Sequence, residues 1–249
     1  NSGNDASLKS YITFDGFTIQ ANNGTELGAV YMEGPDNPPY STGNVIRNCT
    51  FIGPSVKQIV HGDNKQFIFI KNNDKITVQN CLFNNLYHVN SGHNTSAIKM
   101  YYNTDPVIEN CEIYDTTLAI FDKGRSLGAT YRNNYLHNND QGIIFTGYGW
   151  TNSDGSLFTC THRNVKFYNN LVTYSGRGSF GDTTQEWSDS NGMEVYNNTF
   201  YTGNERAVSV GLGGGTKKFY NNIIVGLPLD NDIRQYRLAM AGTVPVQLD

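Results

Sequence analysis

The sequence predicts an all-β fold, a parallel β-helix of about eight coils, and three observations support this. A six-residue motif of alternating apolar and polar character recurs at 14–19, 46–51, 78–83, 108–113, 131–136, 167–172, 195–200 and 219–224. Seven of the eight copies carry Asn at the third position, at successive spacings of 32, 30, 23, 36, 28 and 24 residues. A second short apolar segment precedes most copies. A repeat with a firm minimum length and tolerated insertions is typical of a solenoid with two or three short strands per coil.

Each motif is interpreted as a strand that bends at its third residue, because Asn tolerates a left-handed backbone. In register, these residues would stack about 4.8 Å apart as a ladder of side-chain amides, inside the cylinder or at its corner. The predicted ladder is Asn48, Asn80, Asn110, Asn133, Asn169, Asn197 and Asn221, with Gly16 in the first slot. An antiparallel sandwich with Asn turns is the alternative, but it gives no reason for one motif to recur in every unit.

The preceding segments are predicted as a second set of strands at 29–32, 67–70, 97–100, 119–121, 142–145 and 207–210. If Ile68, Ile70, Ile98 and Met100 point inward, alternation places the intervening residues outward. The outward residues then form two rows. One row contains Tyr31, Phe69, Lys99, Phe121 and Ile144, and the next contains Glu33, Lys71, Tyr101 and Lys123, with Arg125 two residues further on.

Composition fits one elongated domain spanning residues 1–249. The chain has 32 Asn, 26 Gly, 38% apolar and 16% charged residues, and no run of 18 apolar residues, which argues against a disordered or membrane-spanning protein. The net charge of −4 argues against sequence-independent binding of nucleic acid. Neither 1–10 nor 245–249 contains a segment that would cover an end coil. We therefore expect either missing flanking sequence or end-to-end self-association.

Three cysteines fall at one motif position. Cys49, Cys81 and Cys111 occupy the slot that Asn134, Asn170, Asn198 and Asn222 fill in later coils. The pattern does not favour a metal site or a disulfide, because there is no Cys-x-x-Cys spacing and three thiols cannot fully pair. Buried thiols filling a core column are expected. Cys160 lies in an insertion and its state stays open.

Loop lengths indicate where a ligand would bind. Connections are long at 33–45, 146–165 and 182–192 and short at 71–77, 101–107 and 123–130. Insertions at one turn of a solenoid project from one side, so the long loops would wall a trough over the short coils. Its floor would be the two outward rows. Tyr148, Trp150 and Trp187 in the walls are suited to stacking on sugars. The alternative is that the aromatic residues pack under the loops and the lysines are solvated.

The motifs resemble the right-handed parallel β-helix repeat of the pectate-lyase-like superfamily. The resemblance rests on the Asn-Asn and Asn-Cys motifs and on segment 119–124 followed by 131–137, and it covers 12–225. It implies a right-handed β-helix. Members include lyases, glycoside hydrolases, uronate epimerases, phage tailspikes and adhesins. Asn103-Thr-Asp105 matches one of four polygalacturonase motifs, the others are missing, and Asp105-Pro-Val-Ile lacks the His of alginate epimerases.

What remains is the chemistry that the resemblance implies for several β-helix lyases, which use Lys and Arg in the groove, sometimes with calcium. Removing the C5 proton of a uronate requires neutralisation of its carboxylate and a base whose pKa nearby cations can lower. The predicted catalytic residues are Lys123, Tyr101, Lys99 and Arg125, and the predicted substrate-binding residues are Phe69, Lys71, Phe121, Tyr31, Tyr148, Trp150 and Trp187.

Other side chains and functions stay open at this stage. His88 and His93 are a second candidate pair, and Asp182, Glu186 and Asp189 are a candidate calcium site. We expect a secreted or cell-surface protein acting on an anionic polysaccharide by β-elimination. The alternatives are a noncatalytic glycan-binding or adhesin module and a structural filament or tailspike segment.

Overall fold

A computed structural model describes residues 9–21, 28–54, 65–87, 94–146, 150–151, 157–158, 162–173, 178–182, 191–202, 208–210, 216–226, 238–240 and 246–248. All secondary-structure elements among these residues are strands. The described part of the chain contains no helix that is long and apolar enough to cross a membrane. The predictions for His88, His93, Tyr148, Cys160, Glu186, Trp187 and Asp189 fall outside the described residues.

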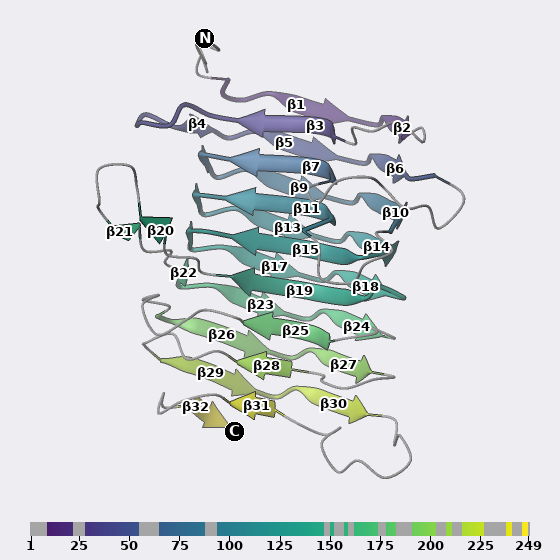
Figure 1. The fold of residues 1–249 in the computed structure, drawn as a ribbon, viewed down its shortest axis with the longest axis vertical. Coiled ribbons are helices and arrows are strands. Elements are labelled where there is room, and N and C mark those ends of the chain that lie inside the picture. Colours follow the sequence, from purple (N-terminus) through teal and green to yellow (C-terminus); the bar gives the residue numbers. More distant parts are fainter. Residues whose placement is uncertain are drawn as a thin grey trace.

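Four sheets, A to D, consist only of parallel strands that stack coil upon coil along the long axis (Figure 1). Sheet A contains β1 (Thr13–Asp15), β5 (Val45–Arg47), β9 (Thr77–Gln79), β13 (Val107–Glu109), β17 (Thr130–Arg132), β23 (Lys166–Tyr168), β26 (Met193–Tyr196), β29 (Lys217–Tyr220) and β32 (Val246–Leu248). Sheet B contains β2 (Thr18–Gln20), β6 (Thr50–Ile52), β10 (Leu82–Leu86), β14 (Glu112–Thr116), β18 (Tyr135–His137), β24 (Leu171–Thr173), β27 (Thr199–Thr202) and β30 (Ile223–Gly226).

The second predicted set of strands forms sheet C. It contains β3 (Gly28–Glu33), β7 (Gln66–Lys71), β11 (Ser96–Tyr101), β15 (Leu118–Lys123), β19 (Gln141–Thr146), β25 (Gly178–Asp182), β28 (Val208–Val210) and β31 (Leu238–Met240). Sheet D is shorter and contains β4 (Ser41–Thr42), β8 (Asn73–Asp74), β12 (Asn103–Thr104), β16 (Ser126–Leu127) and β22 (His162–Arg163). An antiparallel pair, β20 (Trp150–Thr151) and β21 (Leu157–Phe158), completes the strands.

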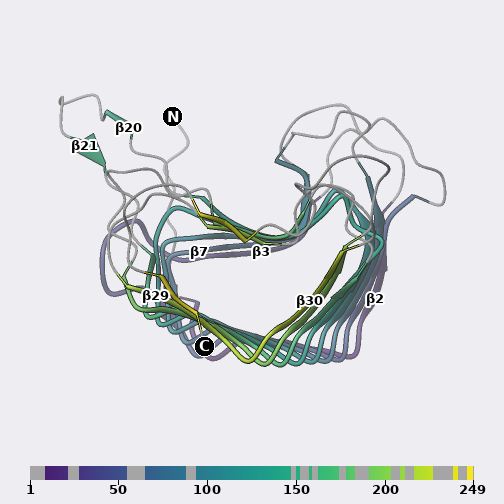
Figure 2. The same ribbon diagram turned by 90° about the horizontal axis from the view of Figure 1, so that it is seen from below.

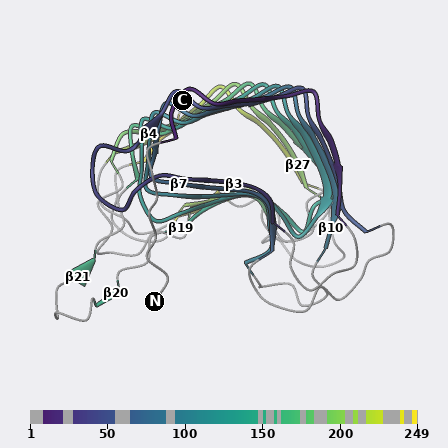
Figure 3. The same ribbon diagram turned by 90° about the horizontal axis from the view of Figure 1, so that it is seen from above.

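The architecture confirms the predicted all-β parallel β-helix. Each coil runs from A to B to C, and in the coils with a D strand it passes through D before re-entering A. Viewed along the long axis, the sheets enclose a continuous interior, with sheet C forming one wall (Figures 2 and 3). Whether flanking sequence or a partner covers the ends stays a prediction.

The repeated Asn makes the bend between sheets A and B. All seven of these Asn residues have a left-handed backbone, with φ between 51° and 55°, and Gly16 has φ of 76° at the equivalent place. Because the Asn side chain is short and can bond locally, this conformation costs it less than other non-glycine residues. The amide of the bend still pairs with the next coil, as from Asn48 N to the Gln79 carbonyl at 3.1 Å.

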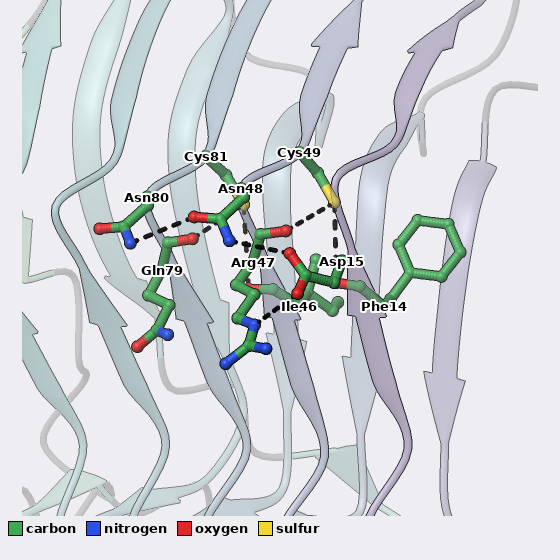
Figure 4. Close-up of polar contacts among 9 residues, drawn as sticks. All are labelled: Phe14, Asp15, Ile46, Arg47, Asn48, Cys49, Gln79, Asn80 and Cys81. Atoms are coloured by element: carbon green, nitrogen blue, oxygen red, sulfur yellow. Dashed lines mark hydrogen bonds and ion pairs between the residues drawn. The ribbon is translucent and has the colours of Figure 1, made fainter.

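The side chains of these bend residues are exposed at the corner, which is one of the two predicted positions. Asn48, Asn80 and Asn110 are all exposed. Asn48 donates to Asp15 at 2.8 Å, and Asn80 donates to Asn48 at 3.3 Å (Figure 4). The residue after the bend turns inward instead, because the left-handed residue interrupts the alternation of the strand. The seven bend residues therefore lie at the corner and not inside the cylinder, and a ladder that runs through all seven of them stays a prediction.

A buried amide ladder does exist one position later in the chain. Asn134 donates from its backbone N and its Nδ2 to Oδ1 of Asn170, both at 3.0 Å. Asn170 makes the same pair of bonds to Asn198, and Asn198 makes them to Asn222. Each Nδ2 also bonds a backbone carbonyl of the preceding coil. The ladder thus satisfies polar groups that the bend leaves inside.

The cysteine column continues this ladder in the earlier coils. Cys49, Cys81 and Cys111 are free and at most 2% exposed, which confirms their predicted burial. Each thiol contacts the carbonyl two residues before it, at 3.0, 3.2 and 3.3 Å (Figure 4 shows the first two). The backbone N of Cys111 donates to Oδ1 of Asn134 at 3.0 Å, so the two columns join.

Inward columns of apolar side chains build the core. In sheet C, Ile68, Ile98, Ile120 and Ile143 are in register and fully buried. In sheet B, Phe51 stacks on Phe83 with ring centroids 4.7 Å apart and planes 4° apart. Stacking identical or similar side chains in register fills the core with closely packed side chains.

We expect Asn170→Leu to lower the free energy of unfolding by at least about 2 kcal/mol. The substitution leaves buried groups of Asn134, Tyr131 and Asn198 without their partner, and each such group costs roughly 1–3 kcal/mol. Asn169→Gly, one residue away at the exposed bend, should change it by less than about 0.5 kcal/mol, since Gly accepts the left-handed backbone. Chemical denaturation of both variants measures this. Equal losses would contradict the assignment of the ladder.

Candidate functional site

The outer face of sheet C carries the predicted rows in the expected register. Tyr31 pairs with Phe69, Phe69 with Lys99, Lys99 with Phe121 and Phe121 with Ile144. In the second row, Glu33 pairs with Lys71 and Lys71 with Tyr101. Lys123 lies on β15 beside β11, on the same face. The parallel β-helix thus brings together residues that are 22 to 38 positions apart in the sequence.

Aromatic rings run diagonally across three coils of this face. The ring centroids of Tyr31 and Phe69 are 5.6 Å apart, and those of Phe69 and Tyr101 are 5.5 Å apart. Tyr102, which the sequence analysis did not select, lies 6.0 Å from Tyr101. Tyr31 is 58% exposed, and Phe69 and Tyr101 are partly exposed. We call Tyr31, Phe69 and Tyr101 the aromatic strip.

Lys99 and Phe121 are buried, contrary to the expectation of an open floor. Lys99 is 1% exposed and Phe121 is 4% exposed. The register places Lys99 between Phe69 and Phe121, and its Nζ lies 6.0 Å from the centroid of the Phe121 ring. The aliphatic stem of a lysine packs readily on such rings, which accounts for this burial in part.

Burial and a like charge alter the acid–base chemistry of Lys99. Desolvation, together with the charge of Lys123, lowers its pKa from the usual 10.5 to about 7. Lys123 itself is partly exposed and lies over two rings, 5.9 Å from the centroid of Tyr101 and 5.7 Å from that of Phe121. These distances suit cation–π contacts. An ammonium and a partly neutral amine therefore share this part of the face.

Lys71 is neutralised by two carboxylates. Its Nζ lies 2.9 Å from Glu33 Oε1 and 2.8 Å from Asp36 Oδ1. Hydrogen bonding to Lys71 lowers the pKa of Asp36. A glycoside hydrolase needs one carboxyl group with a raised pKa to act as general acid, so Asp36, whose pKa is lowered, does not fit that role. Because Lys71 forms ion pairs with both carboxylates, this cluster presents little net positive charge to a ligand.

Two further polar residues, Arg125 and Asp122, lie near the outer face of sheet C but are not part of it. Arg125 follows β15 at the corner between sheets C and D, and its carbonyl accepts a bond from Asn103 N at 3.0 Å. Asp122, next to Lys123, points into the core, where it accepts bonds from Ser126 Oγ at 2.7 Å and Tyr131 Oη at 2.6 Å. Asp122 is fully buried and cannot touch a ligand on the outer face.

The walls of the predicted trough are only partly described. In Figures 2 and 3, β20 and β21 stand away from the body on the outer side of sheet C. Trp150 belongs to β20, and Asp182 ends β25. The trough and the roles of Tyr148, Trp150 and Trp187 stay predictions. Among the residues that the structure covers, no group of three or more His, Cys, Asp or Glu is arranged to hold a metal ion.

Comparison with known proteins supports the fold. No protein-family model and no curated protein matches the chain. Among solved structures, the chain is similar to a mutant tailspike protein of E. coli bacteriophage HK620 in complex with a pentasaccharide, with a TM-score of 0.58 and 14% identity. The match covers 98% of this chain and 43% of the tailspike chain. At this identity the likeness shows the parallel β-helix fold alone, and membership in the pectate-lyase-like superfamily stays a prediction.

The lowered pKa of Lys99 predicts how the free energy of unfolding changes with pH. Between about pH 7 and pH 10.5 the unfolded chain binds more protons at this residue than the folded chain does. The contribution of Lys99 to stability therefore rises with pH across this window, and Lys99→Met should remove that rise. Denaturation at several pH values, with each variant compared with the parent, measures it.

Lys71→Met is the matched control. Its ion pairs raise the pKa of Lys71, so the lysine stays protonated in both states below about pH 10 and adds no slope there. If Lys99→Met leaves the pH dependence of stability unchanged, Lys99 is not desolvated as described.

Proposed function

We propose that the chain is a secreted or cell-surface β-helix protein that binds a polysaccharide on the outer face of sheet C. The aromatic strip carries this proposal. Three rings spaced 5.6 and 5.5 Å apart, one of them 58% exposed, form a continuous apolar surface across three coils. Exposed apolar groups of this size normally mark a contact site, and aromatic faces are suited to the C–H face of a sugar ring.

The charges beside the strip favour an anionic polysaccharide. Lys71 is balanced by Glu33 and Asp36, and Lys99 is only partly protonated near pH 7. The Nζ of Lys123 lies 5.9 Å from the centroid of the Tyr101 ring. A carboxylate on a sugar that stacks on Tyr101 would be attracted to this ammonium. Uronate-containing glycans combine the apolar ring face and the carboxylate.

The tailspike similarity supports a glycan ligand without identifying it. The tailspike was solved with a pentasaccharide, and the fold that it shares with this chain presents long sheet faces of the kind described above. Glycan binding is equally compatible with an adhesin module and with a segment of a tailspike.

Substitutions in the strip test the binding proposal. Tyr31→Ala and Phe69→Ala should each weaken binding to the preferred anionic polysaccharide about 3- to 10-fold, because an aromatic contact contributes roughly 0.5–1.5 kcal/mol beyond its buried area. Tyr135→Ala is the control, since Tyr135 is 38% exposed but lies on sheet B. Titration calorimetry with alginate, pectate and glycosaminoglycan fragments measures affinity. Equal losses in all three variants would reject this face as the binding surface.

A polysaccharide lyase is the second candidate, favoured by Tyr101 and Lys123 lying together near Lys99. In β-elimination a base removes the C5 proton of the uronate, the C4–O bond breaks, a C4–C5 double bond forms and the leaving oxygen takes up a proton. Lys123 would neutralise the carboxylate, and Tyr101 would transfer protons. Lys99, Arg125 and a calcium ion remain proposed contributors.

Mutant kinetics test the lyase candidate. Lys123→Ala and Tyr101→Phe should each reduce turnover at least ~10²-fold, as is typical when an acid–base group is lost. Lys166→Ala, at an exposed position on sheet A, should leave the rate unchanged. The ultraviolet absorbance of the unsaturated uronate product follows the reaction. A parent protein that binds these glycans but produces no such absorbance is a binding module and not a lyase.

A further inference from the structure

Three polar side chains of sheet C are buried although they lie on its outer face. Gln66 is 5% exposed, Ser96 is fully buried and Lys99 is 1% exposed. Gln66 and Ser96 are in register on neighbouring strands, and Gln66 contacts the outward-facing Tyr31. The residues that follow them, Phe67 and Ala97, belong to the core. Gln66 and Ser96 therefore form a polar row beside the aromatic strip.

Part of this row lacks hydrogen-bond partners. Among the described residues, Oε1 of Gln66 and Oγ of Ser96 are buried atoms with no hydrogen bond. Buried polar groups are nearly always bonded to protein, water or ligand, and leaving them unpaired destabilises a fold. Two such groups on adjacent strands, next to an exposed ring, provide hydrogen-bonding capacity that a bound molecule can use.

The row is linked directly to the proposed glycan surface. Nε2 of Gln66 donates to the hydroxyl oxygen of Tyr31 at 3.0 Å, and this is the contact between the row and the strip. Tyr31 is the most exposed member of the strip, so a ligand that replaces its hydroxyl in this hydrogen bond would reach the Gln66 amide.

We propose that Gln66 and Ser96 form a hydroxyl-binding subsite for an uncharged part of the glycan, an inference that rests on the proposed function. An amide oxygen accepts hydrogen bonds and a serine hydroxyl both donates and accepts. Together they suit sugar hydroxyls or the N–H of an acetamido group. A carboxylate, which only accepts, cannot bond to the amide oxygen. The neutral part of the ligand therefore lies at the start of β7 and β11, and the carboxylate lies toward Lys123.

The length of the strand sets the size of the ligand. Ser96 and Tyr101 begin and end β11, five residues apart, which corresponds to about 16 Å at ~3.3 Å per residue. A ligand that reaches both the polar row and the Tyr101–Lys123 end must be longer than one sugar ring. The surface thus selects an oligosaccharide in which a uronate and a neutral sugar are separate units.

Ser96→Ala tests the subsite because affinity and stability should change independently. Removing an unpaired hydroxyl should leave the melting temperature unchanged or raise it, while binding of a glycosaminoglycan oligosaccharide, in which a uronate alternates with an acetamido sugar, weakens about 3- to 10-fold. Ser126→Ala is the matched control. Its hydroxyl is equally buried but bonded to Asp122, so the melting temperature should fall and affinity should be retained.

Two outcomes would overturn the subsite. If Ser96→Ala lowers the melting temperature and leaves affinity unchanged, Ser96 holds a structural water and not a ligand hydroxyl. If Ser96→Ala and Gln66→Met both bind as the parent does while Tyr31→Ala binds weakly, the subsite is rejected but the glycan-binding face stands. A parent that binds no alginate, pectate or glycosaminoglycan fragment rejects both proposals.

Discussion

The structure depends on hydrogen bonding in register between successive coils. Each strand of sheets A, B and C pairs in parallel with the equivalent strand of the next coil, so every coil must bend at the same place. A left-handed residue provides that bend, and Asn is the residue that the chain uses in seven coils. Insertions are tolerated only where they leave this register unchanged. This explains why spacings vary while the motif does not.

Register also creates the candidate site. The constraint that stacks Ile68, Ile98 and Ile120 in the core aligns their outward neighbours in rows. Outside the core, each row position can change without disturbing the pairing. The aromatic strip, the Lys71 ion pairs and the polar row of Gln66 and Ser96 occupy successive positions of the same strands. A solenoid thus separates residues needed for folding from residues available for binding.

The electrostatics of this face arise from neighbours in adjacent coils. Lys71 is balanced by carboxylates from the first coil, whereas Lys99 loses proton affinity through burial and the charge of Lys123. Three lysines with the same intrinsic chemistry therefore have three different surroundings, and the pKa is raised in Lys71 and lowered in Lys99. Similar sequence positions do not imply similar roles, and the resemblance to a tailspike at 14% identity does not supply them.

The sequence alone determined the fold class, the two sets of strands that recur in each coil and the outward rows of sheet C. It could do so because the spacing of the motifs and the period-two alternation are local properties, and parallel pairing in register preserves both. It did not determine which Asn is buried. The left-handed bend resets the alternation, and the buried amides are those of Asn134, Asn170, Asn198 and Asn222.

Burial and charge balance on the outer face were decided by tertiary structure. The ion pair of Lys71 with Asp36 joins residues 35 positions apart, and the burial of Lys99 follows from rings on adjacent strands. The unpaired atoms of Gln66 and Ser96 likewise become visible only in three dimensions. Sequence pattern fixes which way a side chain points, whereas desolvation and hydrogen bonding depend on what lies beside it in the neighbouring coils.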